Sequence, residues 1–596
     1  MYPVVYDYDS LGRLKTSGRS ANPADWVSYS WTKTGRRVTT AFNGRNVATR
    51  GYDAAGRWNS VADSFSNQTS FGYDANSRLT TITRPNGITT TATYFATGEQ
   101  QKLDHKFGAT VRATFTYGVD NMGNVTGRKS SSTATFGAND TFGYDNNNRM
   151  VRQNVAGTNP PNYTYDPADN ATLLAGISNR AQGFGVANQI CFQAVAPATG
   201  TCAAPPTAAT TFGFDPKGNR TTKTVAGATT TYNYDRANRL LGVQGSTITN
   251  TYRGADGLRA NRDDTNSAGT SSGFQWDIAG GLPMLLSEFR TGSVFQWYEY
   301  IYGPGGILVE TTSLNFADGQ PRYFLHDNLG TPRLITNTTG ATAGTRSYDP
   351  YGTQTNQTGN WNDTFNNPYA TLYWAGEQKD NDTGLTYLRA RHYDSTTAQF
   401  LQTDPIAGGS CNTHEYTCAN PLTYTDPTGE TADSLRNRHV PKTKAGVAEA
   451  AVCAQYIWWC APALRDTDEA ADFGGWANDL AFASGRSKVS RDAIENAFRH
   501  AYWQAILTFD FSCGYAQALG NAHEFDSDDP SPGGYRDHLI DYSNNDTGRG
   551  IGRTAKQSGT RNRGETIQRM VVEAYVKDQL LCDNGNGGVA SCRRLK

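Results

Sequence analysis

The stretches Tyr52-Asp-Ala-Ala-Gly-Arg57 and Tyr73-Asp-Ala-Asn-Ser-Arg78 share one pattern: an aromatic residue, an aspartate, three small or polar residues and an arginine. The pattern recurs at Tyr8–Arg13, Tyr144–Arg149 and Tyr234–Arg239, and with one additional residue before the arginine at Phe214–Arg220. Adjacent copies place their aspartates about 20–25 residues apart, a period typical of architectures in which each repeat is one supersecondary unit. The repeat therefore predicts a stacked array rather than an ordinary globular core.

Each unit is predicted to be a β-hairpin. An aromatic-x-aromatic step places two rings on one face of a strand, because side chains alternate along it. Asp, Asn and Gly then supply a turn, through a side-chain-to-backbone hydrogen bond and a residue that tolerates positive φ. The arginine can pair with a carboxylate or stack on a neighbouring ring. A lone hairpin cannot bury its aromatic face, so stacked copies are expected to bury a continuous one.

Composition agrees with a β-rich chain of several domains. The 596 residues include 62 glycines, 32 tyrosines and 25 phenylalanines, which suit short strands and tight turns. The 54 Lys and Arg residues nearly cancel the 55 Asp and Glu residues, so no general binding of nucleic acid through positive charge is expected. No apolar run reaches the length that spans a bilayer; the nearest, 450–464, is interrupted by Gln455 and indicates a buried helix.

The ends and cysteines of the chain carry weaker signals. No secretory signal is visible at the N-terminus, which starts within a repeat and indicates a fragment or a truncated reading frame. The nine cysteines fall mostly into near neighbours, which are candidates for short-loop disulfides. The alternative is a set of scattered thiols. The pairs are Cys191/Cys202, Cys411/Cys418, Cys453/Cys460 and Cys582/Cys592.

The repeats resemble the YD repeats of Rhs proteins, insecticidal toxin-complex C subunits and teneurins. In that family the hairpins spiral into a hollow shell, so the resemblance implies a mainly β shell over residues 1–320. An unrelated β-solenoid or adhesin is the alternative. Residues 321–430 resemble the Rhs-associated core, through the segments Tyr323–Arg333 (YFLHDNLGTPR), Tyr348–Gly352 (YDPYG) and Gly376–Asp394 (GEQKDNDTGLTYLRARHYD).

Two Asp-Pro steps follow this signature, at Asp404-Pro405 and Asp426-Pro427. The resemblance implies that the two aspartates cleave the chain just after the second step, near Glu430. Two carboxylates held close together cannot both ionise easily, so one keeps a proton and the other activates water. The chain departs from the family pattern at Glu430, where leucine is usual, and at 409–411, where Asp-Gly-x is usual before Asn412. In the alternative interpretation both aspartates only cap turns.

Residues 431–596 lose the repeat and show helical periodicity. Residues 445–456 are rich in alanine, Ser490 can cap a helix over 491–508, and 565–581 carries an apolar face. The sequence therefore predicts a small, mostly α-helical C-terminal domain behind the β shell.

This tip gathers residues that suit a hydrolytic site. His500, His523, Glu524 and Asp541 could bind a divalent metal, or a His–Glu pair could act as general acid and base. Arg499 and Arg549 would suit an anionic substrate such as a phosphodiester, and Asn545 joins them as a catalytic candidate. The alternatives are structural histidines and an ordinary turn at Asn545.

The tip resembles an uncharacterised family of toxin tips with the pattern N-A-x-R-H-A-x-W, A-H-E and N-N-x-x-G-R. That resemblance indicates where the C-terminal domain begins, but it does not identify the reaction that the domain catalyses. Among the other histidines, His326 and His392 are predicted to pack as buried polar groups, and no argument attaches to His105, His414 or His439.

Taken together, the sequence predicts a secreted Rhs-type polymorphic toxin, delivered into target cells. Its shell would enclose a C-terminal effector that self-cleavage releases, and the effector would be a hydrolase. The resemblance implies a cognate immunity protein and a delivery machinery as partners. One alternative is a cell-surface binding or structural protein whose C-terminal domain is not an enzyme. Another is membrane disruption through residues 450–464.

Overall fold

The computed structural model describes residues 4–19, 26–131, 140–154, 163–175, 179–244, 248–254, 256–264, 270–291, 295–313, 320–362, 370–406, 412–434, 581–583 and 589–591. The chain divides into two compact units, 1–439 and 440–596. Nearly all of the described residues belong to the first unit, which is therefore described by itself.

Two antiparallel sheets form the wall of this unit, and each runs strictly in chain order. The first sheet has 14 strands: β1 (Val4–Tyr8), β2 (Leu14–Arg19), β3 (Val27–Trp31), β4 (Arg37–Phe42), β5 (Arg45–Tyr52), β6 (Trp58–Ala62), β7 (Gln68–Tyr73), β8 (Leu79–Thr83), β9 (Ile88–Tyr94), β10 (Gln100–Phe107), β11 (Thr110–Val119), β12 (Val125–Ser131), β13 (Asp140–Tyr144) and β14 (Met150–Asn154).

The second sheet has 18 strands: β15 (Thr164–Tyr165), β16 (Ala171–Leu174), β17 (Arg180–Phe184), β18 (Ile190–Val195), β19 (Thr210–Phe214), β20 (Arg220–Val225), β21 (Ala228–Tyr234), β22 (Leu240–Gln244), β23 (Ile248–Tyr252), β24 (Arg259–Asp264), β25 (Thr270–Asp277), β26 (Met284–Thr291), β27 (Gln296–Tyr302), β28 (Leu308–Ser313), β29 (Arg322–His326), β30 (Pro332–Thr336), β31 (Thr342–Tyr348) and β32 (Gln354–Gly359). The wall thus continues past residue 320, because β29–β32 extend the same sheet.

The Asp-x-x-x-Arg pattern makes the hairpin turn, as the turn between β7 and β8 illustrates. Oδ1 of Asp74 accepts the backbone N–H groups of Asn76 (3.0 Å) and Arg78 (2.9 Å), while Oδ2 accepts Nε of Arg78 (2.7 Å). Ser77 adopts a φ of 60° at the tight point of this turn. The same guanidinium lies over the ring of Tyr94 in the next hairpin, so each turn is tied to its successor.

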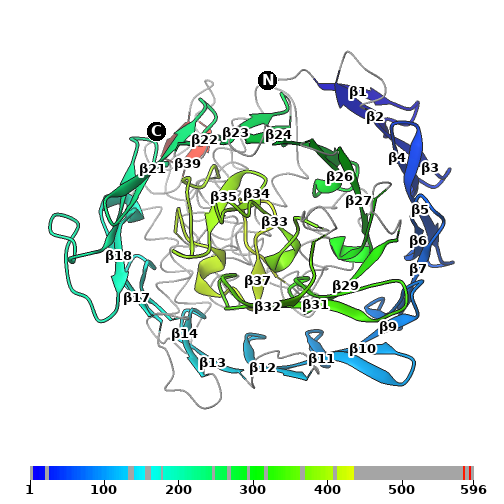
Figure 1. Ribbon diagram of the computed structural model, residues 1–596, viewed down its shortest axis with the longest axis horizontal. Coiled ribbons are helices and arrows are strands. Elements are labelled where there is room, and N and C mark those ends of the chain that lie inside the picture. The colour runs from blue at the N-terminus through cyan, green and yellow to red at the C-terminus, as the bar shows by residue number, and fades with distance from the viewer. Residues whose placement is uncertain are drawn as a thin grey trace, which may run out of the picture. The chain divides into compact units, whose positions relative to one another are not determined.

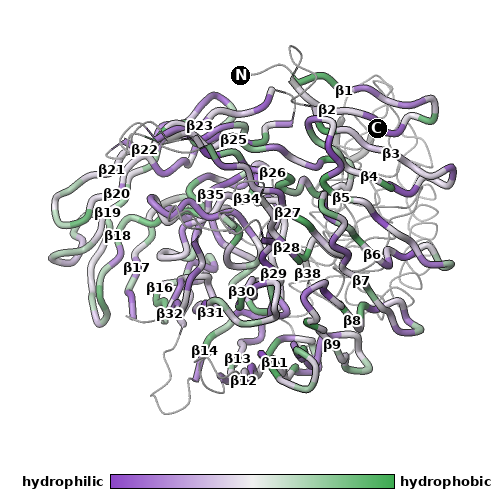
Figure 2. The backbone as a smooth tube through the Cα atoms, turned by 45° about the vertical axis from the view of Figure 1, so that its right-hand side comes forward, coloured by the Kyte–Doolittle hydropathy of each residue, from purple (hydrophilic) through white to green (hydrophobic). Residues whose placement is uncertain are grey.

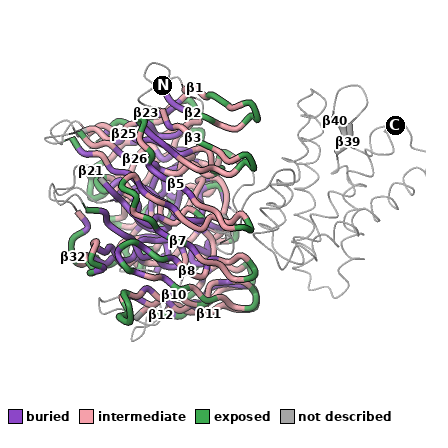
Figure 3. Tube along the Cα trace, turned by 90° about the vertical axis from the view of Figure 1, so that its right-hand side faces the viewer, coloured by how far each residue is buried: buried purple, intermediate pink, exposed green. Residues whose placement is uncertain are grey.

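The apolar core lies between wall segments that are distant in sequence. One cluster joins Val27, Phe42 and Ile82 of the first sheet to Leu286 and Val309 of the second. Hydrophilic and hydrophobic residues alternate along the strands in Figure 2, and buried residues follow the strands while exposed ones gather at hairpin ends in Figure 3. The alternation is the expected signature of strands with one face on a core.

Residues 370–434 form an inner segment, and the two sheets surround its strands in the view of Figure 1. A four-stranded sheet contains β33 (Gln378–Lys379), β34 (Thr386–Leu388), β35 (Arg391–Asp394) and β36 (Gln399–Phe400). A second pair joins β37 (Tyr424–Thr425) to β38 (Asp433–Ser434). Short 3₁₀ turns occur at η2 (Val186–Asn188), η3 (Pro304–Gly306), η4 (Trp374–Gly376) and η5 (Thr417–Ala419).

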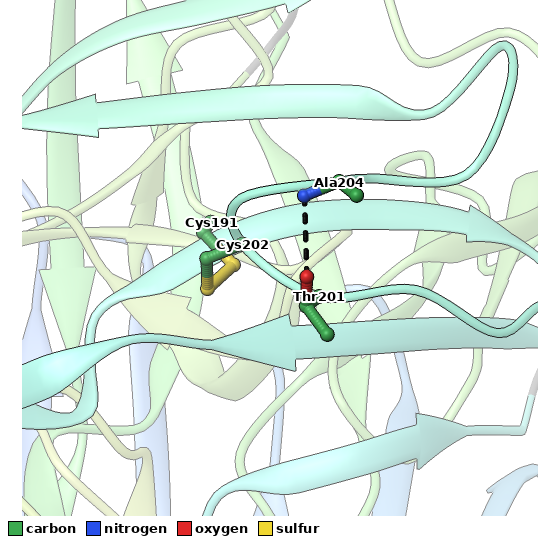
Figure 4. The surroundings of a disulfide bond; sticks show 4 residues. All are labelled: Cys191, Thr201, Cys202 and Ala204. Carbon is green, nitrogen blue, oxygen red and sulfur yellow. Dashed lines mark hydrogen bonds between the residues drawn. A yellow bond between two sulfur atoms is a disulfide. The ribbon is translucent and has the colours of Figure 1, made fainter.

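A disulfide between Cys191 of β18 and Cys202 closes the loop that leads toward β19 (Figure 4). Within this loop the backbone N–H of Ala204 donates to the carbonyl oxygen of Thr201 at 3.1 Å. Cys418 is also disulfide-bonded. The predicted pairing of Cys191 with Cys202 is therefore confirmed.

The predicted mainly β fold is confirmed, whereas the helical tip falls mostly outside the described residues. Within 440–596 the structure describes only β39 (Leu581–Asp583) and β40 (Val589–Ser591), which pair as an antiparallel hairpin. The predicted helix over 565–581 was wrong at its last residue, because Leu581 begins β39. No helix among the described residues is long and apolar enough to cross a membrane.

Candidate self-cleavage site

The inner segment brings both predicted aspartates onto one arginine. Arg391 begins β35, Asp404 follows β36, and Asp426 directly follows β37. Nη2 of Arg391 lies 3.2 Å from Oδ2 of Asp404 and 3.3 Å from Oδ2 of Asp426. The three side chains are 1–3% exposed, so their charges interact with little screening by water.

Each aspartate uses its other carboxylate oxygen to cap a turn. Oδ1 of Asp404 accepts the N–H of Ile406 at 2.9 Å. Oδ1 of Asp426 accepts the backbone N–H groups of Gly429 (2.8 Å), Glu430 (3.1 Å) and Thr431 (3.2 Å). The interpretation of both aspartates as turn caps therefore explains the hydrogen bonds of their Oδ1 atoms. Their Oδ2 atoms contact Arg391 instead.

Gly429 has no tolerable replacement in this turn. Its φ is +73°, and a Cβ atom added there would lie 2.4 Å from the carbonyl oxygen of Leu388 and 3.0 Å from the backbone nitrogen of Arg391. A close approach of two backbones in a left-handed conformation requires glycine. The turn therefore lies directly against the strand end that carries the arginine.

Arg391 also contacts the peptide bond at the predicted cleavage position. Its Nε donates to the carbonyl oxygen of Gly429, its Nη1 donates to the carbonyl oxygen of Thr413 at 3.2 Å, and its guanidinium lies 3.6 Å from the ring centroid of Phe400. The amide N–H of the same Gly429–Glu430 bond points to Asp426. Both ends of this peptide group thus meet charged side chains.

Burial sets the protonation of the cluster. Burial raises the pKa of Asp426, while Arg391 and the surrounding hydrogen-bond donors act in the opposite direction. Burial, followed by the charges of Asp404 and Asp426, raises the pKa of the Glu430 carboxyl. Burial lowers the pKa of Arg391, and the two aspartates oppose this effect. A proton is therefore held in this cluster more readily than by carboxyl groups in water.

The other predicted site residues are not tested by this geometry. The tip candidates His500, His523, Glu524, Asp541, Arg499, Arg549 and Asn545 lie outside the described residues. In the part of the chain that the structure describes, no group of His, Cys, Asp and Glu residues is arranged to hold a metal ion. The metal site in the tip stays a prediction.

Sequence reasoning missed Arg391, although it quoted the segment that contains it. The arginine precedes Asp404 by one short hairpin, so its position was visible, but nothing local marks it as the partner of both aspartates. His414 was also left without an interpretation. Its Nε2 donates to the carbonyl oxygen of Gly218 at 2.8 Å, and burial lowers its pKa to about 4.

The buried histidines of the wall and core have structural contacts. His105 interacts through Nδ1 with Oγ1 of Thr90 (2.7 Å) and through Nε2 with the carbonyl oxygen of His326 (2.9 Å), and burial lowers its pKa to about 3. Burial also lowers the pKa of His392 to about 3. His326 and His392 are both buried, in line with the polar packing predicted for them.

Comparison with known families agrees with the repeat geometry. Residues 52–90, from the end of β5 to the start of β9, match the family model described as RHS Repeat. The chain is therefore an Rhs/YD-repeat protein, similar to curated proteins that include a deaminase toxin and Rhs and WapA nucleases. Residues 450–579 of this Rhs protein match a model described as "Domain of unknown function (DUF6973)", a description that assigns no activity to the tip.

Curated relatives of this Rhs protein include a bacterial nuclease and a bacterial deaminase toxin. It is 28% identical over 225 residues to the tRNA3(Ser)-specific nuclease WapA of Bacillus spizizenii, covering 37% of this chain and 7% of the relative. It is 28% identical over 247 residues to the double-stranded DNA deaminase toxin A of Burkholderia cenocepacia, covering 37% of this chain and 17% of the relative. The chain thus matches only a small part of each relative's length.

Among solved structures, the crystal structure of TcdB2-TccC3 resembles this Rhs protein with a TM-score of 0.53 and 17% identity. The match covers 71% of this chain and 24% of the solved one. At this identity the likeness supports the fold alone.

Proposed function

We propose that this Rhs protein is a toxin that cleaves itself between Gly429 and Glu430 and so frees a C-terminal effector from its covalent link to the wall. One observation carries the proposal: the carbonyl of this peptide bond accepts from Arg391, and its N–H donates to Asp426. The reaction requires only groups of this chain and one water molecule, which is the second substrate.

The chemistry follows from the two carboxyl groups. Asp404 takes a proton from a water molecule, whose oxygen attacks the carbonyl carbon of Gly429. Arg391 stabilises the negative charge that develops on the carbonyl oxygen. Asp426 gives its proton to the nitrogen of Glu430 as the C–N bond breaks, leaving a carboxyl group on Gly429 and an amino group on Glu430. The raised pKa of Asp426 suits the acid in this pair.

Cleavage would leave the product in place at first. Strand β38 lies beyond the cut bond, yet Asp433 and Ser434 pair with Thr425 and Tyr424 of β37. The backbone of the released piece therefore keeps hydrogen bonds to the piece it came from. This arrangement supports a cleaved effector that stays attached until the wall opens.

For the effector we propose a hydrolase that acts on an anionic substrate, with His500, His523, Glu524, Asp541, Arg499, Arg549 and Asn545 as its candidate residues. A divalent metal held by His500, His523, Glu524 and Asp541 is part of this proposal. The nuclease named among the relatives supports an anionic substrate. A cognate immunity protein and delivery into target cells complete the proposed function.

Self-cleavage is tested with the purified full chain. Wild type should separate into two fragments on denaturing gels, while Asp404→Asn and Asp426→Asn should remain one band. Asp382→Asn serves as the control, because this carboxylate also belongs to the inner segment but is 35% exposed and contacts Arg262 instead of Arg391. An uncut wild type, or cleavage that persists in both dyad variants, would overturn the proposal.

The effector is tested in a bacterial host that lacks an immunity protein. Expression of residues 430–596 should arrest growth, and His500→Ala or His523→Ala should restore it at equal protein levels. Growth that continues with folded wild-type fragment would instead favour the alternative, a surface-binding protein with a passive C-terminal domain.

A further inference from the structure

Two versions of the repeat turn recur in the wall, beside the threonine turns at Asp327–Thr331 and Asp349–Thr353. The residue four positions after the turn aspartate is arginine at Arg13, Arg57, Arg78, Arg149 and Arg239. It is asparagine at Asn67, Asn124, Asn170 and Asn219. Both versions donate a side-chain N–H to Oδ2 of the aspartate, as in Arg78 to Asp74 (2.7 Å) and Asn124 to Asp120 (2.9 Å). The turn itself is therefore satisfied by either residue.

The arginine version uses its remaining donors on the next hairpin of the wall. Nη1 of Arg78 donates to the carbonyl oxygen of Phe95 at 3.2 Å, and the guanidinium lies 4.8 Å from the ring centroid of Tyr94. Arg57 makes the matching contacts with the carbonyl oxygen of Asp74 and the ring of Tyr73. These contacts link neighbours along the wall.

Two turns of the asparagine version also bind the next turn of the wall, through Nδ2 of Asn124 to Oδ1 of Asn148 (3.0 Å) and Nδ2 of Asn170 to Oδ1 of Asn188 (3.1 Å), and in addition they receive the inner segment. Oδ1 of Asn124 accepts Nδ2 of Asn420 at 2.8 Å. Oδ1 of Asn170 accepts Nδ2 of Asn412 at 2.6 Å, and the same Nδ2 donates to the carbonyl oxygen of Ala168 at 2.9 Å. Each pair joins residues more than two hundred positions apart, and all four amide side chains are buried.

A third asparagine turn, at Asn219, also meets the inner segment, but through its backbone. The carbonyl oxygen of Gly218 accepts Nε2 of His414 at 2.8 Å. The N–H of Arg220 donates to the carbonyl oxygen of Leu401 at 2.8 Å, and the carbonyl oxygen of Lys217 accepts Oγ1 of Thr403 at 3.1 Å. Three docking points thus hold residues 401–403 and 412–420 against the wall.

The chemistry of the two side chains explains the difference. An amide carries an acceptor oxygen beside its donors, whereas a guanidinium has five donors and no acceptor. Only the asparagine version can therefore bind its own aspartate and still accept an N–H from another segment. An arginine at position 124 or 170 would place guanidinium N–H donors against the Nδ2 donor of Asn420 or Asn412. Its side chain would also occupy the volume of the docked loop.

The docked residues connect directly to the two aspartates. The carbonyl oxygen of Thr413, next to Asn412, accepts the N–H of Asp404 at 3.0 Å and Nη1 of Arg391 at 3.2 Å. The hydroxyl of Tyr416 accepts the N–H of Asp426 at 3.2 Å. The loop that the asparagine turns hold thus fixes the backbone of both aspartates.

We propose that Asn124 and Asn170 are positioning residues for self-cleavage: they dock the loop between the two Asp-Pro steps on the wall and so align Asp404 and Asp426 on Arg391. The consequence for cleavage rests on the proposed function, whereas the docking itself does not. At Asn124 and Asn170, asparagine in place of the repeat arginine thus marks where the wall binds the inner segment.

The test exchanges the two versions of the turn in the full-length chain. Asn124→Arg and Asn170→Arg restore the arginine that other wall turns carry, and Arg78→Asn makes the opposite exchange where no inner segment docks. Hydrogen–deuterium exchange is measured in an Asp426→Asn background, so that all chains remain uncut. Each asparagine variant should speed exchange over 412–426 about tenfold, as expected for one lost buried hydrogen bond, without lowering the melting temperature of the wall.

Cleavage rates are then measured without the Asp426→Asn change. Each asparagine variant should cleave about tenfold more slowly than wild type, and Arg78→Asn should cleave normally. Asn412→Ala and Asn420→Ala remove the other side of each contact and should match the wall variants, which keeps the test decisive if an introduced arginine prevents folding. Unchanged exchange over 412–426 in both pairs of variants would overturn the docking. If wild type does not cleave, the exchange data still decide the docking and only the proposed cleavage fails.

Discussion

The wall turns and the inner segment use the same ion pair in opposite ways. In the wall, Arg57 and Asp53 lie 2.8 Å apart and are 23% and 24% exposed, and similar pairs recur from turn to turn. In the inner segment, Arg391 is 1% exposed and serves two buried aspartates. An exposed pair contributes about 0–1 kcal/mol, but removing one partner of a buried pair costs about 3–5 kcal/mol. In the wall, the stabilisation is thus distributed over many similar turns. In the inner segment, the stability depends on single residues such as Arg391.

The largest effect is expected at Arg391. Arg391→Met should stop cleavage, and in an uncut Asp426→Asn chain it leaves buried Asp404 without its counter-charge, so the free energy of unfolding should fall by about 3–5 kcal/mol. Urea denaturation of the uncut Asp426→Asn chain, with and without the arginine change, measures the loss. A loss below about 1 kcal/mol would mean that the inner and wall pairs do not differ as described.

The pH dependence of stability tests the comparison at another buried carboxylate of the inner segment, Asp380. Burial alone would raise its pKa, but Arg259 and Arg262 outweigh burial and lower the pKa from 3.8 to about 2. A depressed carboxyl pKa stabilises the fold above its unfolded value, and that contribution is lost as pH falls through the folded value. Stability should therefore drop by about 2 kcal/mol between about pH 4 and pH 2, and Asp380→Asn should flatten this part of the curve. Thermal melts across this window provide the measurement; an equal drop in the variant would contradict the assignment.

Gly429 tests how closely the turn must lie against β35. Alanine at a left-handed backbone position costs about 1–2 kcal/mol, and its Cβ would also meet the carbonyl oxygen of Leu388. Gly429→Ala should therefore slow cleavage strongly while the wall keeps its melting temperature. Gly384→Ala, also at positive φ but with open space around its Cβ, is the matched control and should cleave at the wild-type rate. Equal rates for the two variants would show that the close approach is unimportant.

The smallest effect is expected in the wall. Arg57→Ala removes a partly exposed ion pair and a contact with the ring of Tyr73, at a cost of about 0–1 kcal/mol. The melting temperature should change little and cleavage should continue at the wild-type rate. A loss of stability comparable to that of Arg391→Met would show that the stabilisation is not distributed over the wall turns.

The wall could be predicted from sequence because its turns are local. The turn at Asp74 is complete within five residues, so the pattern itself reports the structure. The inner contacts are not local: Asn412 meets Asn170 across 242 positions, and no period or motif connects them. The Asp404 and Asp426 pairing was found only because the family resemblance supplied it.

One repeat was misread for a physical reason. The pattern predicts Arg220 as the repeat arginine of Phe214–Arg220, but the turn position belongs to Asn219, whose Nδ2 donates to Asp215. Arg220 instead lies inside the wall, and its Nη1 donates to Oδ2 of Asp394 at 2.8 Å. The asparagine version of the turn also occurs at Asp120 and Asp166, where a search for arginine passes over it.

The most direct test of the account is the intact mass of the fragments that the purified full-length chain produces. Cleavage by the Asp404–Asp426 pair predicts two masses, those of residues 1–429 and 430–596, and a single uncut mass for Asp426→Asn. A smaller fragment that begins elsewhere, or the same two masses from Asp426→Asn, would contradict the assignment of this site.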